Sequence, residues 1–313
     1  MKPIITMTER VESYLEARRS LGFQLKIEGQ ELLRFAKFAD ESGHKGAVTE
    51  ELALCWAQSA ETLKPLYRAR RLEVVTTFAR YQKMIEPEGE IPLPGILGPA
   101  HSRTQPYIYT DKEILCLIDA ARQLKSHKRL RAETYATLIG LIACTGLRAS
   151  EALRLQCTDV DLESGVIRVC ETKFHKTRLV PLHPSAVTAL SRYTTIRNQT
   201  VHKTSTFFSD ENGNRIPYST ARFTFRKLTD SVIDPTSAHR RPRFHDLRHT
   251  FACQCLLRWY SSGIDVNQRI AALSTYLGHV KVSDTYWYLS GTPELMSIVC
   301  DRFERFVRGE DVR

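Results

Sequence analysis

The sequence lacks an apolar run long enough to cross a lipid bilayer. Its longest apolar stretch lies near Thr137–Leu147, whereas a spanning helix needs about 20 apolar residues in succession. The N-terminus also lacks a basic segment followed by an apolar run, which is the pattern of a secretory signal peptide. These absences predict a cytoplasmic protein with no membrane partner.

Closely spaced cysteines are also missing. The eight cysteines are dispersed and no two form a C-x-x-C pair, so neither a disulfide framework nor a zinc site is predicted. Most of them lie in apolar stretches, where a free cysteine behaves as a small hydrophobic residue. No metal site is expected.

Positive charge is in excess, with 45 Lys and Arg against 35 Asp and Glu and a net charge of +10. A hydrophobic content of 42% is ordinary for a globular protein. A basic protein of this size is a candidate nucleic-acid binder. Charge alone is equally compatible with a basic protein that binds no nucleic acid.

The 313 residues suggest about two domains, each with its own core. Residues 86–106 contain five prolines, which remove backbone donors and exclude a regular helix or an inner strand. We therefore predict an N-terminal domain of residues 1–90, an extended linker of residues 91–106 and a C-terminal domain of residues 107–313.

Helical spacing of apolar residues predicts a small N-terminal bundle of four helices, the first capped by Thr8. The other three cover roughly residues 25–41, 49–60 and 65–85. The last helix and its approach carry Lys64, Arg68 and Arg71 among other basic residues. This surface either faces phosphates or is a solvated face.

The C-terminal domain is predicted to be mainly helical with a small β-sheet, an α+β fold. A capping box at Thr110–Glu113 opens a helix, and an almost wholly apolar helix follows over residues 132–144. Alternating β-branched residues over 165–173 and 177–182 predict a hairpin. Further helices are predicted at the ranges 149–155, 185–199, 218–232, 246–261, 266–276 and 282–289, followed by an apolar stripe in residues 293–307.

Two arginines stand in settings suited to an anion. His245 and Arg248 are spaced i, i+3 at the start of a helix, so both side chains reach the same ligand and the helix N-terminus adds positive potential. Arg148 follows the helix break at Gly146, and its planar fork fits two phosphate oxygens. Glu151, one turn later, either orients Arg148 or a histidine or is an ordinary first-turn charge.

Three further groups complete the set. Lys173 lies at the predicted hairpin tip, where it could donate a proton to a departing alkoxide, and Lys176 is the competing candidate. His279 follows a glycine that presents its imidazole at a turn. Tyr286 and Tyr288 follow closely. Together these cations, imidazoles and phenols suit a phosphodiester that is gripped by fixed cations and attacked by a tyrosine.

Four segments carry a family resemblance: T-G-L-R-A-S-E from Thr145, a lysine hairpin that ends in R-L-V-P-L, H-D-L-R-H-T-F-A from His245, and L-G-H ending at His279 with a tyrosine nine residues later. In this order they resemble the Xer-like tyrosine recombinases of the phage integrase family, including recombinases of mobile elements. The resemblance covers about residues 107–290 closely. The N-terminal bundle is similar only in size and helical character.

The resemblance implies the role of each residue. Arg148 and Arg248 would clamp the scissile phosphate, and Lys173 would protonate the leaving 5′-oxygen. His245 and His279 would bond the phosphoryl oxygens, with His245 the acceptor of the tyrosine proton. The nucleophile would be Tyr288, since Tyr286 is two residues short of the family spacing, and Glu151 would be a supporting residue.

The resemblance also implies the partners. The substrate would be double-stranded DNA, held by two domains that close as a C-clamp, and no cofactor would be needed. A C-terminal helix at about residues 294–307 would pass to a neighbouring protomer, giving a dimer or tetramer on DNA, although packing within its own chain is the alternative. Related recombinase subunits are further candidate partners. The competing functions are a non-cleaving DNA-binding subunit and a type IB topoisomerase that relaxes supercoils.

Overall fold

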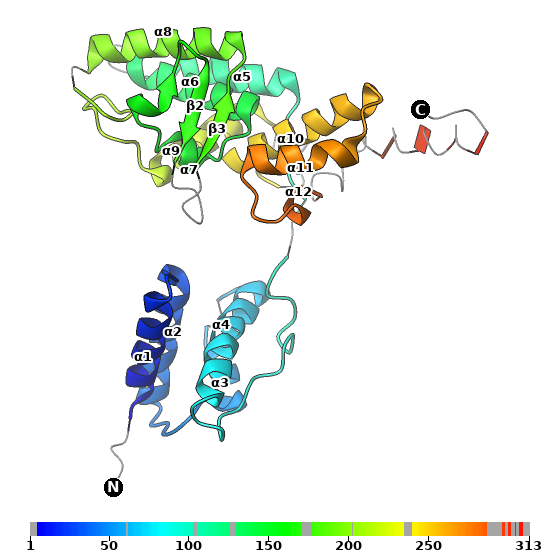
Figure 1. Cartoon of the computed structure of the whole chain (residues 1–313). Helices are drawn as coiled ribbons and strands as arrows, with labels where there is room; N and C mark the ends of the chain where they lie inside the picture. The colour runs from blue at the N-terminus through cyan, green and yellow to red at the C-terminus, as the bar shows by residue number, and fades with distance from the viewer. Residues whose placement is uncertain are drawn as a thin grey trace. The chain divides into compact units, whose positions relative to one another are not determined.

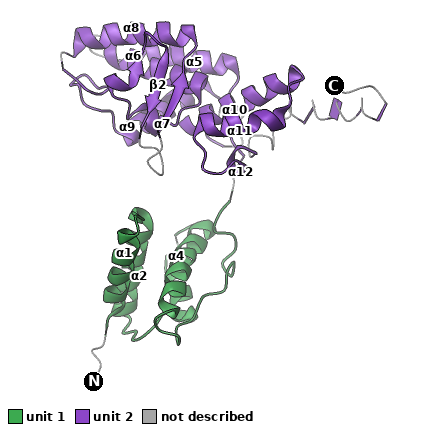
Figure 2. Cartoon of the chain, in the orientation of Figure 1, with its two compact units in different colours: residues 1–104 green, residues 105–313 purple. Residues whose placement is uncertain are grey.

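The computed structural model describes residues 5–60, 62–102, 105–125, 129–170, 177–201, 203–234 and 240–286, with a few residues of the C-terminal tail. The chain forms two compact units, Met1–Thr104 and Gln105–Arg313 (Figure 2). Each unit has its own hydrophobic core. The elements are mostly helices, with one small sheet (Figure 1). The predicted fold class, mainly α with a small β-sheet, is therefore confirmed.

Unit 1 is a bundle of the four predicted helices. They are α1 (Met7–Ser20), α2 (Lys26–Glu41), α3 (Glu50–Gln58) and α4 (Pro65–Lys83). Their apolar faces meet around Phe35, Trp56 and Phe78, which are almost completely buried. The proline-rich segment after α4 begins along this unit, because the backbone N–H of Glu90 donates to the carbonyl of Val48 at 2.8 Å.

The predicted cap of the first helix is wrong by two residues. Thr6 is the N-cap: its side chain accepts from the backbone N–H of Glu9, whose carboxylate accepts from the backbone N–H of Thr6. Thr8 instead donates from its hydroxyl to the carboxylate of Asp40 at 2.6 Å. Thr8 therefore ties α1 to the end of α2, a tertiary role that local sequence does not reveal.

Unit 2 is built around one buried helix. Its helices are α5 (Asp111–Arg122), α6 (Leu130–Thr145), α7 (Ala149–Ala152), α8 (Pro184–Thr200), α9 (Tyr218–Val232), α10 (Phe244–Ser261), α11 (Val266–Leu277) and α12 (Ser283–Tyr286). Twelve of the 16 residues of α6 are buried, as its apolar sequence predicts. The helices α5, α8 and α10 pack around it.

The small sheet of unit 2 is antiparallel. Its strands are β1 (Val160–Asp161), β2 (Val166–Val169) and β3 (Arg178–Pro181), in the order β1-β2-β3. Ile167 pairs with Val180, and both are fully buried against the core. The predicted hairpin is confirmed, whereas the two-residue strand β1 was not predicted. The hairpin tip, residues 171–176, lies outside the described residues.

The apolar stretches around the cysteines do not bury most of them: all eight are free thiols, Cys253 is buried and five others are exposed. Apolar neighbours in sequence did not place them inside, because several occupy outward-facing helix positions. The predicted helix over residues 282–289 is described only as α12, and the predicted tail helix lies largely outside the described residues.

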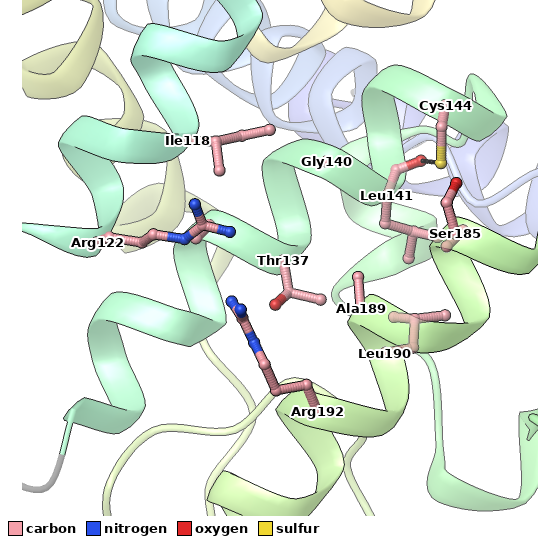
Figure 3. A pocket seen from close by; sticks show the side chains of 12 residues that line it. Ile118, Arg122, Thr137, Gly140, Leu141, Cys144, Ser185, Ala189, Leu190 and Arg192 are labelled. Carbon is pink, nitrogen blue, oxygen red and sulfur yellow. Dashed lines mark hydrogen bonds between the residues drawn. The ribbon is translucent and has the colours of Figure 1, made fainter.

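A pocket of about 200 Å³ lies between α5, α6 and α8 of unit 2 (Figure 3). Ile118, Thr137 and Leu190 contribute to its lining. None of the residues that line it is a predicted site residue, so this pocket is not the place of the chemistry. Among the described residues, no helix is both long and apolar enough to cross a membrane.

Candidate active site

The site begins where α6 ends. Gly146 caps this helix with a left-handed backbone, φ 64°. A Cβ at this position would lie 2.5 Å from the Cδ1 atom of Phe251 on α10, so only glycine fits without displacement. The chain then turns directly into α7, with Arg148 as its N-cap residue.

Arg248 holds three parts of the site together. It comes from the first turns of α10 and is 1% exposed. Its Nη1 donates to the carbonyl of Gly146 at 2.8 Å, and its Nη2 donates to the carbonyl of Leu277 at 2.6 Å. These carbonyls lie at the C-terminal ends of α6 and α11, where helix dipoles favour a cation. The guanidinium is therefore fixed before any ligand binds.

Arg148 is held by a buried carboxylate. Its Nη1 donates to Oε1 of Glu151 at 2.7 Å, and its Nη2 donates to the carbonyl of Gly278 at 3.3 Å. About a third of the Arg148 side chain stays exposed, against 7% of that of Glu151. Arg148 therefore keeps an accessible cationic edge that a ligand anion can reach.

The carboxylate of Glu151 lies between two arginines. Both its oxygens accept from Arg178, at 3.2 and 2.7 Å. Burial alone would raise the pKa of Glu151, but hydrogen bonds and charge from Arg178, together with bonds from Arg148, lower it to about 2. The carboxylate is thus ionised throughout the neutral range. Glu151 is therefore a hydrogen-bonding partner of Arg148 in the fold.

The end of α11 presents His279. Gly278 caps the helix with φ 69°, and the backbone N–H of His279 donates to the carbonyl of Ser274 at 2.9 Å. The Nδ1 atom of His279 lies 2.7 Å from the hydroxyl oxygen of Thr285, which is fully buried at α12. The imidazole is therefore oriented by both its backbone and its ring.

The two predicted histidines are neutral at pH 7. Burial, together with the positive charges of Arg248, Arg243 and Arg148, lowers the pKa of His245 to about 4 against the opposing charge of Asp246. Burial likewise lowers the pKa of His279 to about 4, with Arg248 and Arg148 adding to the effect. A neutral imidazole can accept a proton or donate one hydrogen bond.

A buried acid anchors the start of α10. Asp246 is fully buried and accepts from the side chain of Arg240 at 2.6 Å and from the backbone N–H of Arg243 at 2.8 Å. Thr250, one turn later, accepts from the backbone N–H of Tyr109 at 3.0 Å. These bonds fix the helix turn that carries His245 and Arg248.

The structure brings four predicted site residues together: Arg148, His245, Arg248 and His279. They come from three segments spread over more than 130 positions of the chain, because His245 and Arg248 share α10. Figure 1 shows the elements α7, α10, α11 and α12 that carry or adjoin them within unit 2. The other predicted residues of this unit, Lys173, Lys176 and Tyr288, lie outside the described residues.

The neighbouring tyrosine and the basic residues of unit 1 are described. Tyr286 lies on α12 with 47% of its surface exposed. Lys64 is exposed at the start of α4, and Arg68 is half-buried. The guanidinium of Arg71 lies 4.0 Å above the ring of Trp56, and burial lowers its pKa. Arg71 is therefore less available to a phosphate than Lys64.

Three residues of the site were missed from sequence. Arg178 stands in the R-L-V-P-L segment, but its partner Glu151 is 27 positions away. His249 packs against His245 with perpendicular rings 4.8 Å apart, one helical turn along α10; that i, i+4 spacing is a signal the sequence does contain. Gly278 was predicted only to form a turn. It also leaves space for Arg178, because a Cβ on Gly278 would lie 2.8 Å from Nη1 of that side chain.

This fold and this grouping of arginines with neutral histidines define a DNA breaking and rejoining enzyme of the tyrosine recombinase class. The phage integrase family model matches residues 108–294. The chain belongs to the phage integrase family. It is a site-specific recombinase by that membership.

Relatives match over nearly the whole chain. The protein named integrase/recombinase y4rB of Sinorhizobium fredii is 40% identical over 98% of this chain and 99% of its own length. Tyrosine recombinase XerC of Pelobacter propionicus is 25% identical over 96% of each chain. Among solved structures, the Tn1549 transposon integrase in complex with transposon right end DNA has a TM-score of 0.70 at 15% identity, covering 96% of this chain and 99% of that one. That structure shares the fold.

Proposed function

We propose that this recombinase cuts DNA through a covalent 3′-phosphotyrosine at Tyr288 and that the four grouped residues hold the scissile phosphate. The observation that carries the proposal is the convergence of Arg148, His245, Arg248 and His279 at the ends of α6, α10 and α11. Arg248 is locked by two backbone carbonyls, so its donors are placed without reorganisation when charge develops.

The proposed step balances without a cofactor. The phenolic oxygen of Tyr288 attacks phosphorus, and its proton passes to neutral His245. The bond from phosphorus to the 5′-oxygen breaks, and Lys173 donates a proton to that oxygen. The products are a 3′-phosphotyrosine and a free 5′-hydroxyl, and the reverse reaction on a new 5′-hydroxyl rejoins the strand.

Fixed cations explain how a tyrosine attacks at neutral pH. The ordinary pKa of a tyrosine is about 10, so the reaction needs a base and charge stabilisation nearby. Arg148 and Arg248 supply positive charge where the phosphorane gains negative charge, and His279 supplies a further donor. One such preorganised donor contributes about 3 kcal/mol to lowering the barrier.

The partners follow from the same proposal. The two units close around duplex DNA as a C-clamp, in which unit 1 contacts phosphates through Lys64, Arg68 and Arg71 and the hairpin adds Lys176. Binding should therefore weaken steeply with added salt. Residues 294–307 pass to a neighbouring protomer and support a dimer or tetramer on DNA. Such an enzyme acts in the cytoplasm, on integration, excision or resolution of a mobile element.

The test needs a DNA site, which the protein itself can select. Duplexes with randomised arms are enriched by gel shift with the Tyr288→Phe variant, which should bind without cutting. The enriched site is then rebuilt with a nick beside the cleavage point, so that the released fragment diffuses away and the adduct is trapped.

The wild-type chain should form a covalent adduct on this nicked duplex, and Tyr288→Phe should form none while binding equally well. Tyr286→Phe is the matched control, and it should still form the adduct. An adduct that survives Tyr288→Phe and disappears in Tyr286→Phe would assign the nucleophile to the other tyrosine. Binding without any adduct in the wild-type chain would indicate a non-cleaving subunit.

A further inference from the structure

Arg178 makes contacts that no role in the proposed reaction requires. It is the first residue of β3, and its side chain is 11% exposed. Its two terminal nitrogens donate to the two oxygens of Glu151, and its Nε donates to the carbonyl of Tyr276 at 2.9 Å. One side chain thus joins the sheet, the start of α7 and the end of α11.

The end of α11 is shaped to admit this guanidinium. A Cβ on Gly278 would lie 2.8 Å from Nη1 of Arg178 and 3.1 Å from its Cζ. The carbonyl of the same glycine accepts from Arg148. Arg178 therefore packs directly against Gly278, the residue that precedes His279 and bonds Arg148. The three hydrogen bonds that Arg178 donates fix it in a single orientation.

We propose that Arg178 is a positioning residue that couples β3, the second strand of the lysine hairpin, to the Arg148–Glu151 pair and to the segment that presents His279. It acts through Glu151 and the end of α11, not by touching DNA. This inference rests on the proposed function, because it assigns Arg178 a part in aligning the groups of that reaction. Since β3 starts five residues after Lys173, the same contact anchors the start of the second strand of the predicted lysine hairpin.

Charge explains why an arginine is needed here. Among the described residues, the charged groups that face Glu151 are Arg148 from the start of α7 and Arg178 from β3, and the phenol of Tyr276 interacts with Arg178. Burial is the largest single influence on Glu151 and raises its pKa. Without Arg178, burial would be opposed by Arg148 alone. A protonated Glu151 would then release Arg148 from its present orientation.

The test uses the full chain and the nicked duplex selected with Tyr288→Phe. Arg178→Met removes all three bonds, and Arg178→Lys keeps the charge but cannot bond both Glu151 oxygens and the Tyr276 carbonyl together. Arg168→Met is the matched control: Arg168 lies on the neighbouring strand β2, about half exposed, and pairs only loosely with Asp159 at 3.5 Å. Adduct formation is followed in single turnover against pH, and binding is followed by gel shift.

Arg178→Met should bind the duplex within about 3-fold of wild type and cleave it about 10²-fold more slowly, the cost expected of a misplaced catalytic group. On acidification, the cleavage rate of Arg178→Met should begin to fall at a higher pH than the rate of wild type does, because Glu151 takes up its proton at a higher pH in the variant. A purely structural role would not move this pH profile. Arg168→Met should match wild type in rate and profile.

Three results would overturn the inference. The first is cleavage at the wild-type rate by a folded Arg178→Met variant, and the second is slow cleavage by that variant with an unchanged pH profile. The third, which applies if Arg178→Met does not fold, is cleavage at the wild-type rate by Arg178→Lys. Slowed cleavage by a folded Arg178→Lys supports the inference. Absence of an adduct with the wild-type chain would instead contradict the proposed function, so the two failures are distinguishable.

Discussion

Replacing Arg248 should cost both stability and cleavage, because the same donors serve both. The guanidinium is almost fully buried and bonds the carbonyls of Gly146 and Leu277. Arg248→Met leaves these two carbonyls without their donors, at about 1–3 kcal/mol each. The sum is about 2–6 kcal/mol, and loss of a buried charge offsets part of it. We therefore expect the free energy of unfolding of unit 2 to fall by about 3 kcal/mol in this variant.

For a domain of this size, that change lowers the unfolding temperature of unit 2 by about 10 °C. Calorimetry measures it, with the transition of unit 1 as an internal reference. Arg222→Met, an exposed arginine on α9, is the control and should leave both transitions unchanged. The unfolding temperature of unit 2 in Arg248→Lys should lie between those of wild type and Arg248→Met, since an ammonium can donate well to one of the two carbonyls.

Cleavage by Arg248→Met should fall by about 10²–10³-fold, the loss typical of one preorganised donor. Measuring it at a temperature below the lowered transition separates the catalytic loss from unfolding. An unfolding temperature within 1–2 °C of wild type, the scale of a surface substitution, would refute the idea that Arg248 joins α6 to α11. Retained cleavage would refute its role as a phosphate clamp.

Two further predictions concern the frame of the site. Gly146→Ala should destabilise unit 2 by about 2–5 kcal/mol, from the strain of φ 64° and the contact with Phe251. Gly263→Ala, at φ 70° with nothing within 4 Å of the added Cβ, is the control. It should show the cost of the backbone strain alone in the same calorimetry. The pKa values of His245 and His279 lie at about 4 in the fold, below the ordinary 6.5, so the unfolded chain binds protons first. Their contribution to stability is full above pH 6.5 and is lost as the pH falls toward 4. The unfolding temperature of unit 2 should therefore fall over that window, and it should fall less in His245→Gln. An equal dependence of the unfolding temperature on pH in the variant would contradict this.

Local patterns in the sequence predicted those elements whose signals are local. The capping box of Thr110 with Glu113 was predicted and is present, because both partners lie within one helical turn. Alternation predicted the pairing of β2 with β3, because the two strands follow one another in the sequence. Thr8 was mistaken for a cap because its real partner, Asp40, lies on another helix.

The candidate site shows the same division. The motifs around Arg148, His245, Arg248 and His279 named residues that the fold does bring together. Their supports are long-range contacts that no spacing reveals. The carbonyl of Leu277 meets Arg248 across 29 positions, and Arg178 meets Glu151 across 27. Burial, which makes both histidines neutral, is likewise a property of the packed core.

The most direct test of the account is to identify the amino acid that bears the DNA in the trapped complex. After digestion of the adduct on the selected nicked duplex, peptide mass spectrometry should find a nucleotide joined through its 3′-phosphate to Tyr288, with a free 5′-hydroxyl on the released strand. Attachment through a 5′-phosphate, or to any residue other than Tyr288, would contradict the account.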